Sequence, residues 1–296
     1  MDSQSNAIAG PGIQSQAAAP GMPAIVRPLY WSIKRELWEN RSIYIAPLIV
    51  AGLVLLGNAI GLIGGSFTVG VHTPSHTGAI AVSHYEIASN LIMATTLLVA
   101  IFYCLDALYG ERRDRSILFW KSMPVSDTVT VLAKASIPLV VLPLLTFGLI
   151  VVTQTIMLLL NVTVFRGVNP EWAHPRLLQD WLGLLYHLLA IHSLWYSPIF
   201  AWLLLVSAWA RRTVILWAVV PPLGIGILER LVFNTSYFAE MMKYRFAGPH
   251  GSMSGHSMTS VTPAELLATP GLWLGLAVTA IFLGLAIQLR RYRGPV

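Results

Sequence analysis

Long apolar runs alternate with short polar segments along this chain of 296 residues. A helix rises about 1.5 Å per residue, so roughly 20 apolar residues cross a hydrocarbon core of about 30 Å. Runs of this kind recur along the whole chain after its first segment. The pattern therefore predicts six transmembrane helices, at about 43–64, 87–109, 135–164, 181–210, 213–233 and 266–289.

The composition places the chain among membrane proteins. Hydrophobic residues make up 55% and charged residues only 11%, whereas soluble domains carry about 25% charged residues. We therefore expect an all-α polytopic membrane protein. The single cysteine, Cys104, excludes a disulfide framework and a thiolate metal cluster.

The first residues differ from the rest, since 1–24 are rich in Ala, Gly, Ser, Gln and Pro and carry no Lys or Arg. We predict a disordered tail there and a single transmembrane domain over 25–296. Just before the first span, Arg27–Arg41 places Leu29, Ile33 and Leu37 at helical spacing. This segment is either an amphipathic helix in the inner headgroup layer or an extension of the first span.

Lys and Arg are unevenly distributed between the predicted loops. Most of them fall on one side of the membrane if the N-terminus is cytoplasmic. The positive-inside rule therefore predicts both termini in the cytoplasm. Because the basic residues flank apolar runs, they indicate topology, and we expect no nucleic-acid partner.

The fifth run is short and contains Pro221 and Pro222. Proline removes a helix hydrogen bond, so this run is either a kinked ordinary span or a broken, re-entrant helix. The following segment, Asn234–Glu265, is expected to be the largest soluble piece on the outer side. Its end, TPAELL from Thr262, is typical of a capped helix start with Pro at the first position.

The segment between the second and third spans, Asp106–Lys134, carries the strongest functional signal. Its charges come first and are followed by an apolar patch, Ile117–Trp120. An apolar patch rimmed by Arg and Lys is typical of a docking surface. A plain loop with the usual inside-positive bias is the simpler alternative.

This segment resembles the corresponding one in permease subunits of type-2 ABC transporters, the six-span bacterial type. The motif covers Glu111–Lys134, and Arg115-Ser116 replaces the Gly-Thr that often follows Glu-Arg. The six-span plan and the segment before the first span extend the resemblance over most of the chain. The residues that carry it are Glu111, Arg112, Ser116, Leu118, Pro124, Val125, Ser126 and Lys134.

The resemblance implies a permease subunit in the bacterial plasma (inner) membrane that exports an unidentified substrate. Its expected partners are a separate ATPase subunit, a second permease copy or paralogue, and membrane lipid. The chain has no Gly-x-x-x-x-Gly-Lys-Ser/Thr loop, so ATP and Mg would bind the ATPase, and the chain itself would be no enzyme and bind no cofactor. A short cytoplasmic coupling helix would dock the ATPase through Glu111, Arg112, Ser116, Ile117, Leu118, Phe119, Trp120, Lys121 and Pro124.

Four polar side chains inside predicted spans are candidates for lining a pathway: Asn58, Gln154, His187 and His192. Amides in membranes commonly bridge helices, and a lone histidine commonly packs as a hydrogen-bonded residue, so these alternatives stay open. The two histidines are five residues apart, which in an α-helix places them roughly 140° apart. This spacing argues against a paired metal site.

A second candidate for metal chemistry is the outer segment HGSMSGHSM. His250, Met253, His256 and Met258 combine imidazole with thioether, which suits Cu(I), although a Gly/Ser loop also collects such residues without binding. Copper-linked transport through this loop and a non-transporting scaffold or sensor are the alternatives to ABC export. The sequence shows no nucleophile–His–acid set, which argues against an intramembrane hydrolase, and no carboxylate at mid-span, which argues against an ion-coupled transporter.

Overall fold

The computed structural model describes residues 26–64, 84–122, 125–164, 177–248 and 262–292, and every regular element in these ranges is a helix. Five helices are long and apolar enough to cross a membrane, and a bent pair makes a sixth if it counts as one span. The prediction of an all-α, multi-pass membrane protein is therefore confirmed, with five or six spans. The five are Ser42–Ile63, Tyr85–Arg113, Asp127–Leu160, Val214–Val232 and Pro270–Tyr292.

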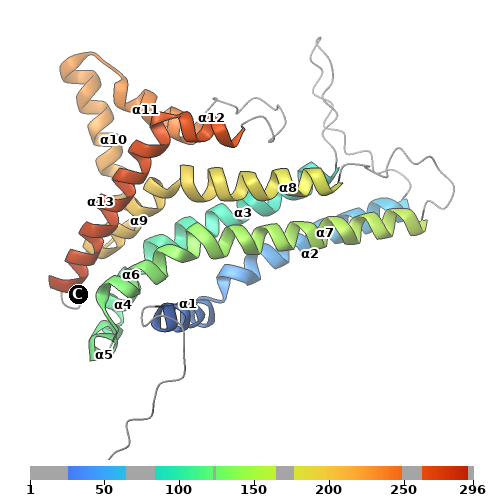
Figure 1. Cartoon of the computed structure of the whole chain (residues 1–296), viewed down its shortest axis with the longest axis horizontal. Helices are drawn as coiled ribbons and strands as arrows, with labels where there is room; N and C mark the ends of the chain where they lie inside the picture. The colour runs from blue at the N-terminus through green and yellow to red at the C-terminus, as the bar shows by residue number, and fades with distance from the viewer. Residues whose placement is uncertain (1–25, 65–83, 123–124, 165–176, 249–261, 293–296) are drawn as a thin grey trace, which may run out of the picture.

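The predicted amphipathic segment forms a helix of its own, α1 (Val26–Glu39). It stops at Asn40, whose side-chain amide donates to the carbonyl of Glu36 at 3.3 Å. The next helix, α2 (Ser42–Gly64), leaves in another direction, because α1 is seen almost end-on where α2 runs obliquely (Figure 1). Hence α1 is not a straight extension of the first span.

The second span, α3 (His84–Asp106), is followed by two short helices, α4 (Tyr109–Arg113) and α5 (Ser116–Ser122). The third span begins at Asp127 rather than at the predicted 135, because α6 (Asp127–Ser136), the π-helix η1 (Ile137–Val141) and α7 (Leu142–Val164) follow without a break. Ser126 caps α6 by accepting the N–H of Val129 at 3.3 Å. This cap moves the start of the helix into a polar stretch that hydropathy alone excludes.

The fourth span is bent, although a single uninterrupted span was predicted over 181–210. It consists of α8 (Leu177–His187), the π-helix η3 (Leu188–Trp195) and α9 (Ser197–Trp209), with a bend of 47°. Proline has no N–H, so Pro198 cannot donate to the carbonyl of Leu194. The hydroxyl of Ser197 donates to that carbonyl instead, at 2.8 Å.

The fifth span, α10 (Val214–Phe233), is continuous through Pro221 and Pro222, which agrees with an ordinary span. It ends at Asn234, whose φ of 50° is a left-handed conformation that Asn tolerates. A further helix, α11 (Tyr237–Ala247), follows in the segment that was predicted to be the largest soluble piece. Hydropathy did not indicate α11 because it mixes charged and aromatic residues.

The capped helix start at TPAELL is confirmed, since Thr262 and Glu265 form a capping box ahead of α12 (Pro263–Ala268). The predicted span 266–289 includes the end of α12. In the structure the sixth span is a separate helix. Thr269 is extended, as a residue before proline prefers, and α13 (Pro270–Tyr292) begins after it. The predicted boundary is therefore wrong by about one helical turn.

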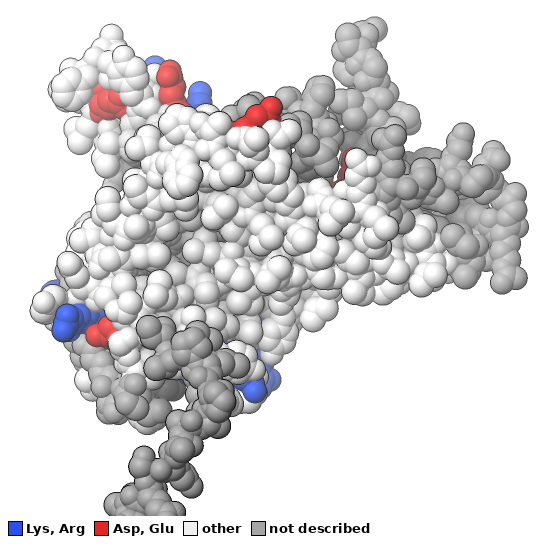
Figure 2. All heavy atoms as spheres, viewed as in Figure 1, with Lys and Arg blue, Asp and Glu red and all other residues white. Residues whose placement is uncertain are grey.

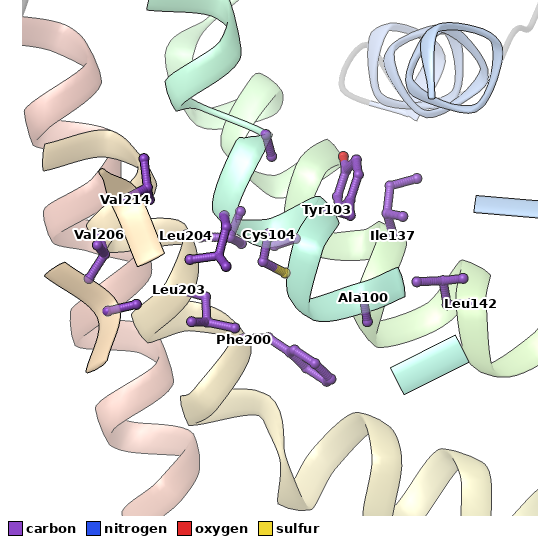
Figure 3. Packing of buried hydrophobic residues seen from close by; sticks show 14 of the residues in the cluster. Ala100, Tyr103, Cys104, Ile137, Leu142, Phe200, Leu203, Leu204, Val206 and Val214 are labelled. Carbon is purple, nitrogen blue, oxygen red and sulfur yellow. The ribbon is translucent and has the colours of Figure 1, made fainter. Parts of the chain in front are cut away.

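The largest buried cluster lies where α3, α9, η1 and α10 meet (Figure 3). Cys104 and Leu204 are buried at its centre, beside Phe200. Lipid hydrocarbon is as apolar as a leucine side chain, so burial from lipid gives little driving force. Such a cluster therefore stabilises the helix bundle mainly through close packing. From this base α2, α3, α7 and α8 run together as one group, whereas α10 and α13 each pack against α9 (Figure 1).

Candidate functional site

Charged side chains from four helices meet inside the protein, where α1, α4, α6 and α13 converge. Lys134 Nζ lies 2.8 Å from Glu36 Oε1 and 3.1 Å from Glu111 Oε1. Arg290 pairs with Glu111 and, through Nε at 3.1 Å, with Asp127 Oδ1. We call this set the ion network: Arg35, Glu36, Glu111, Asp127, Lys134 and Arg290.

The ion network is tolerated in the interior because its charges alternate and balance. Removing an ion from water costs several kcal/mol, and the side chains of Glu36, Lys134 and Arg290 are only 1%, 3% and 4% exposed. Glu36 also accepts the hydroxyl of Tyr103 at 3.0 Å. With three cations and three carboxylates, the network carries no net charge and ties distant parts of the chain to one point.

The pKa of the Glu36 carboxyl lies below its ordinary value of 4.5. Burial acts to raise it, but the charge and hydrogen bond of Lys134, helped by Arg35, outweigh burial. A lowered pKa in the folded state contributes stability above the pKa of the unfolded chain, and this contribution is lost as the pH falls through the folded value.

We therefore expect the melting temperature to change little between pH 7 and pH 5 through this group and to fall below about pH 4.5. The Glu36→Gln variant, which cannot titrate at this position, should lack that part of the acid-induced loss. Thermal unfolding of both proteins across this pH range measures the difference. Identical pH profiles would contradict a stabilising ionised Glu36.

A second set of contacts fixes the turn between α3 and α4 against the end of α9. Ser207, which is fully buried, accepts the N–H groups of Leu108 at 3.0 Å and Tyr109 at 2.9 Å. These donors open α4 and have no partner within the helix. Arg112 donates to the carbonyls of Ser207 and Ala210. Glu111 and Arg112, both predicted site residues, thus hold α4 to α6, α9 and α13.

The short helix α5 extends from this fixed base. Ser116 donates to the carbonyl of Glu111 at 3.4 Å, and Ile117 is buried with 1% exposure. Leu118 and Phe119, in contrast, are 59% and 58% exposed. Trp120 and Lys121 belong to α5, but their side chains, like the whole of Pro124, lie outside the described residues.

On the face shown in Figure 2, charges gather at the upper and at the lower end of the view, with a largely uncharged surface between them. The end with α4 and α5 holds the ion network and the exposed side chains of Arg113 and Asp114. Within the described residues, no group of three or more His, Cys, Asp or Glu could hold a metal ion.

Sequence reasoning selected Glu111 and Arg112 but missed several of their partners as site residues. Glu36, Arg290 and Ser207 are not among the candidate site residues that the sequence indicates. The available signal was weak, because Lys134 stands directly beside the apolar run 135–164. A charge in that position either reaches the headgroup layer or meets a buried partner.

The amide candidates in the spans differ in their surroundings. Gln154 donates to Ser89 at 2.9 Å and accepts the indole N–H of Trp181 at 2.7 Å, so it bridges α3, α7 and α8. Asn58 is half-buried in α2, and its amide nitrogen has no hydrogen-bond partner among the residues described. A pathway role for either residue stays a prediction.

The histidine candidates are closer than predicted. His187 and His192 have ring centroids 5.7 Å apart, because η3 is π-helical and not α-helical. The expectation that they lie on different faces is therefore wrong. His250, Met253, His256 and Met258 all fall outside the described residues.

Comparison with known proteins gives no family for this chain. No protein-family model, no curated protein and no solved structure matches it.

Proposed function

We propose that this protein is the membrane-spanning permease subunit of an ATP-binding cassette exporter, driven by ATP hydrolysis on a separate subunit. One observation carries the proposal. The exposed apolar residues Leu118 and Phe119 lie on a short helix whose base is tied to the bundle by buried ion pairs. This arrangement suits a docking helix that passes movement of a partner to the spans.

The exposed residues of α5 call for a covering partner. If α5 faces the cytoplasm, as the distribution of Lys and Arg predicts, two large apolar side chains stand in water. Apolar anchors surrounded by charged residues are the usual centre of a protein interface. Arg113 and Asp114, 57% and 62% exposed, supply part of that rim. A groove on an ATPase subunit is the partner that we propose.

The connections below α5 would transmit its movement. Glu111 contacts Lys134 of α6 and Arg290 of α13, and Arg112 contacts the end of α9. Buried pairs of this kind resist separation, because an unpaired charge left in the interior is costly. Tilting of α5 would therefore move the ends of three spans together.

The helix α1 fits an interfacial position in the same proposal. Trp31 and Trp38 are 56% and 70% exposed, and the Lys34 ammonium lies 5.2 Å and 5.0 Å from their ring centroids. Tryptophan and lysine are typical of the headgroup region. In this arrangement both termini are cytoplasmic, α1 rests on lipid, and a second permease copy completes the transporter.

The double substitution Leu118→Ser and Phe119→Ser is expected to abolish association with the ATPase. It removes the apolar anchors of the interface while leaving Ile117 and the ion network in place. The measurement is co-purification with a co-expressed nucleotide-binding subunit, together with ATP turnover in proteoliposomes. Leu132→Ser, at a 44% exposed leucine of α6, is the matched control and should retain the complex. A stable, coupled complex of the double variant would refute the docking role of α5.

A further inference from the structure

The turn between α9 and α10 presents two arginines at one end of the bundle. Arg211 and Arg212 lie in this turn, and both residues are exposed. Within the described ranges, neither forms an ion pair with a carboxylate. The turn itself is fixed, because the carbonyls of Ser207 and Ala210 accept the guanidinium of Arg112. Two positive charges therefore stand at a defined place beside α4.

Two tryptophans mark the depth of this turn in the membrane. The rings of Trp209 and Trp217 meet edge to face with their centroids 4.7 Å apart, and they are 39% and 41% exposed. Tryptophan is enriched in the headgroup layer of membranes. Trp217 lies four residues, or about 6 Å, along α10 from Thr213. The arginines and this tryptophan pair thus share the polar edge of the membrane.

An open apolar groove adjoins the arginines on the surface of α10. Its volume is about 510 Å³, within the range of about 300–1,000 Å³ that is usual for ligand sites. Its seven-residue length corresponds to about 10 Å of helix, so it fits inside one leaflet of a hydrocarbon core about 30 Å thick. The lining residues are Thr213, Val214, Ile215, Leu216, Val219 and Val220. We call the two arginines and this groove the α9–α10 corner.

The described part of the chain leaves this groove uncovered. The buried edge of α10 consists of Val214 and Ala218, and the indole N–H of Trp202 donates to the carbonyl of Ala218 at 3.1 Å. In contrast, Leu216 and Val219 are 58% and 49% exposed. Because Trp202 ties α10 to α9 along the buried edge, the exposed side of the helix stays turned away from the bundle. Its occupant has to come from outside the chain.

The α9–α10 corner combines positive charge at the headgroup layer with apolar surface below it. A second copy of this chain on a two-fold axis would bring the same patch, and hence both arginine pairs, face to face, and like charges so placed oppose binding. A soluble anion would leave the groove empty. Arginine forms bidentate hydrogen bonds with phosphate, and an acyl chain matches the groove.

We propose that the α9–α10 corner binds one anionic phospholipid, with its phosphate on Arg211 and Arg212 and an acyl chain along Leu216 and Val219. The expected cytoplasmic position of this end agrees with the proposal, because anionic lipid in the cytoplasmic leaflet attracts Lys and Arg. The site concerns lipid binding and is independent of the proposed export function.

The first test titrates the delipidated full chain in neutral detergent with phosphatidylglycerol or with phosphatidylcholine of the same acyl chains. Native mass spectrometry counts the bound lipid, and we expect one phosphatidylglycerol to bind in preference. Arg211→Gln with Arg212→Gln should weaken its binding roughly tenfold or more, since each arginine near anionic lipid contributes about fivefold. Arg230→Gln with Lys243→Gln removes two exposed cations from the other end of α10 and from α11, and should bind normally. Equal binding by the two double variants overturns the proposal.

Two other occupants are outcomes of the same titration. Glycerol 3-phosphate carries the phosphate without acyl chains and should not displace the lipid. Displacement would show a site for a soluble phosphate and overturn the assignment to lipid. A dimer that forms without lipid and is lost in Val219→Trp would place a second copy on this face, which also overturns it.

A second measurement locates the lipid in the unmodified site. The protein is placed in phosphatidylcholine vesicles that contain a small fraction of phosphatidylglycerol brominated in its acyl chains. Bromine near α10 should quench Trp217, so the Trp217→Phe variant should lose this part of the quenching. Brominated phosphatidylcholine at the same fraction should quench less. Equal quenching by the two brominated lipids would refute selection of the anionic headgroup.

Discussion

Replacement of Lys134 with Met is expected to lower the free energy of unfolding by about 3–5 kcal/mol. The Lys134 side chain is 3% exposed and lies between the carboxylates of Glu36 and Glu111, at 2.8 Å and 3.1 Å. Without the Lys134 ammonium, the buried carboxylates of Glu36 and Glu111 lose the cation that they share. Their desolvation and mutual repulsion are then compensated less. Reversible denaturation in mild detergent, followed by tryptophan fluorescence, measures the loss.

The matched variants separate a lost pair from a lost side chain. Glu36→Met with Lys134→Met removes both partners of one pair, and it should be less destabilised than the sum of the single changes. Arg113→Ala breaks an exposed ion pair with Asp114 and should leave stability almost unchanged, because water and salt screen the pair. Strictly additive effects of Glu36 and Lys134 would show that the pair contributes no coupling.

Part of this site could be predicted from the sequence, and the rest depends on tertiary structure. Glu111 and Arg112 follow an apolar run and precede an apolar patch, so the local sequence is enough to identify them as candidates. Apart from Lys134, their partners lie 76 to 179 residues away along the chain, as the pairs Arg35–Glu111 and Arg290–Glu111 show. Helical periodicity describes one segment at a time, so it cannot indicate which inner ends converge.

The spans show the same division between local and tertiary causes. Length and hydropathy predict that α2, α3, α7 and α10 are helices, because each of these apolar runs is by itself long enough to cross the hydrocarbon core. The bend of the fourth span also has a local signal, since Pro198 interrupts the run 181–210. The π-helical turn in η3 has no such signal. The spacing of His187 and His192 was therefore misjudged, because an α-helical period was assumed.

Replacement of Trp195 with Ala is expected to cost about 3–5 kcal/mol, as for other buried aromatic residues. Trp195 is fully buried at the end of η3, and its indole N–H donates to the carbonyl of Arg245 at 2.9 Å. Arg245 in turn donates to the Trp195 carbonyl at 3.3 Å and lies 4.7 Å from the ring centroid. A side chain at Gly275 would displace this guanidinium, so glycine at this position keeps room for Arg245 beside α13. The contacts fasten α11 to the bend of the fourth span.

Two further variants grade the effect. Trp195→Phe keeps most of the ring packing and loses one hydrogen bond, so about 1 kcal/mol is expected. Trp273→Ala, at a 59% exposed tryptophan of α13, should likewise cost about 1 kcal/mol for its bond to Leu267. Hydrogen exchange should show that Trp195→Ala lowers the protection of α11 amides more than that of α9 amides, because α9 retains its own buried contacts. Unchanged protection of α11 would mean that Tyr196, whose hydroxyl donates to the Phe246 carbonyl at 3.1 Å, holds this helix without Trp195.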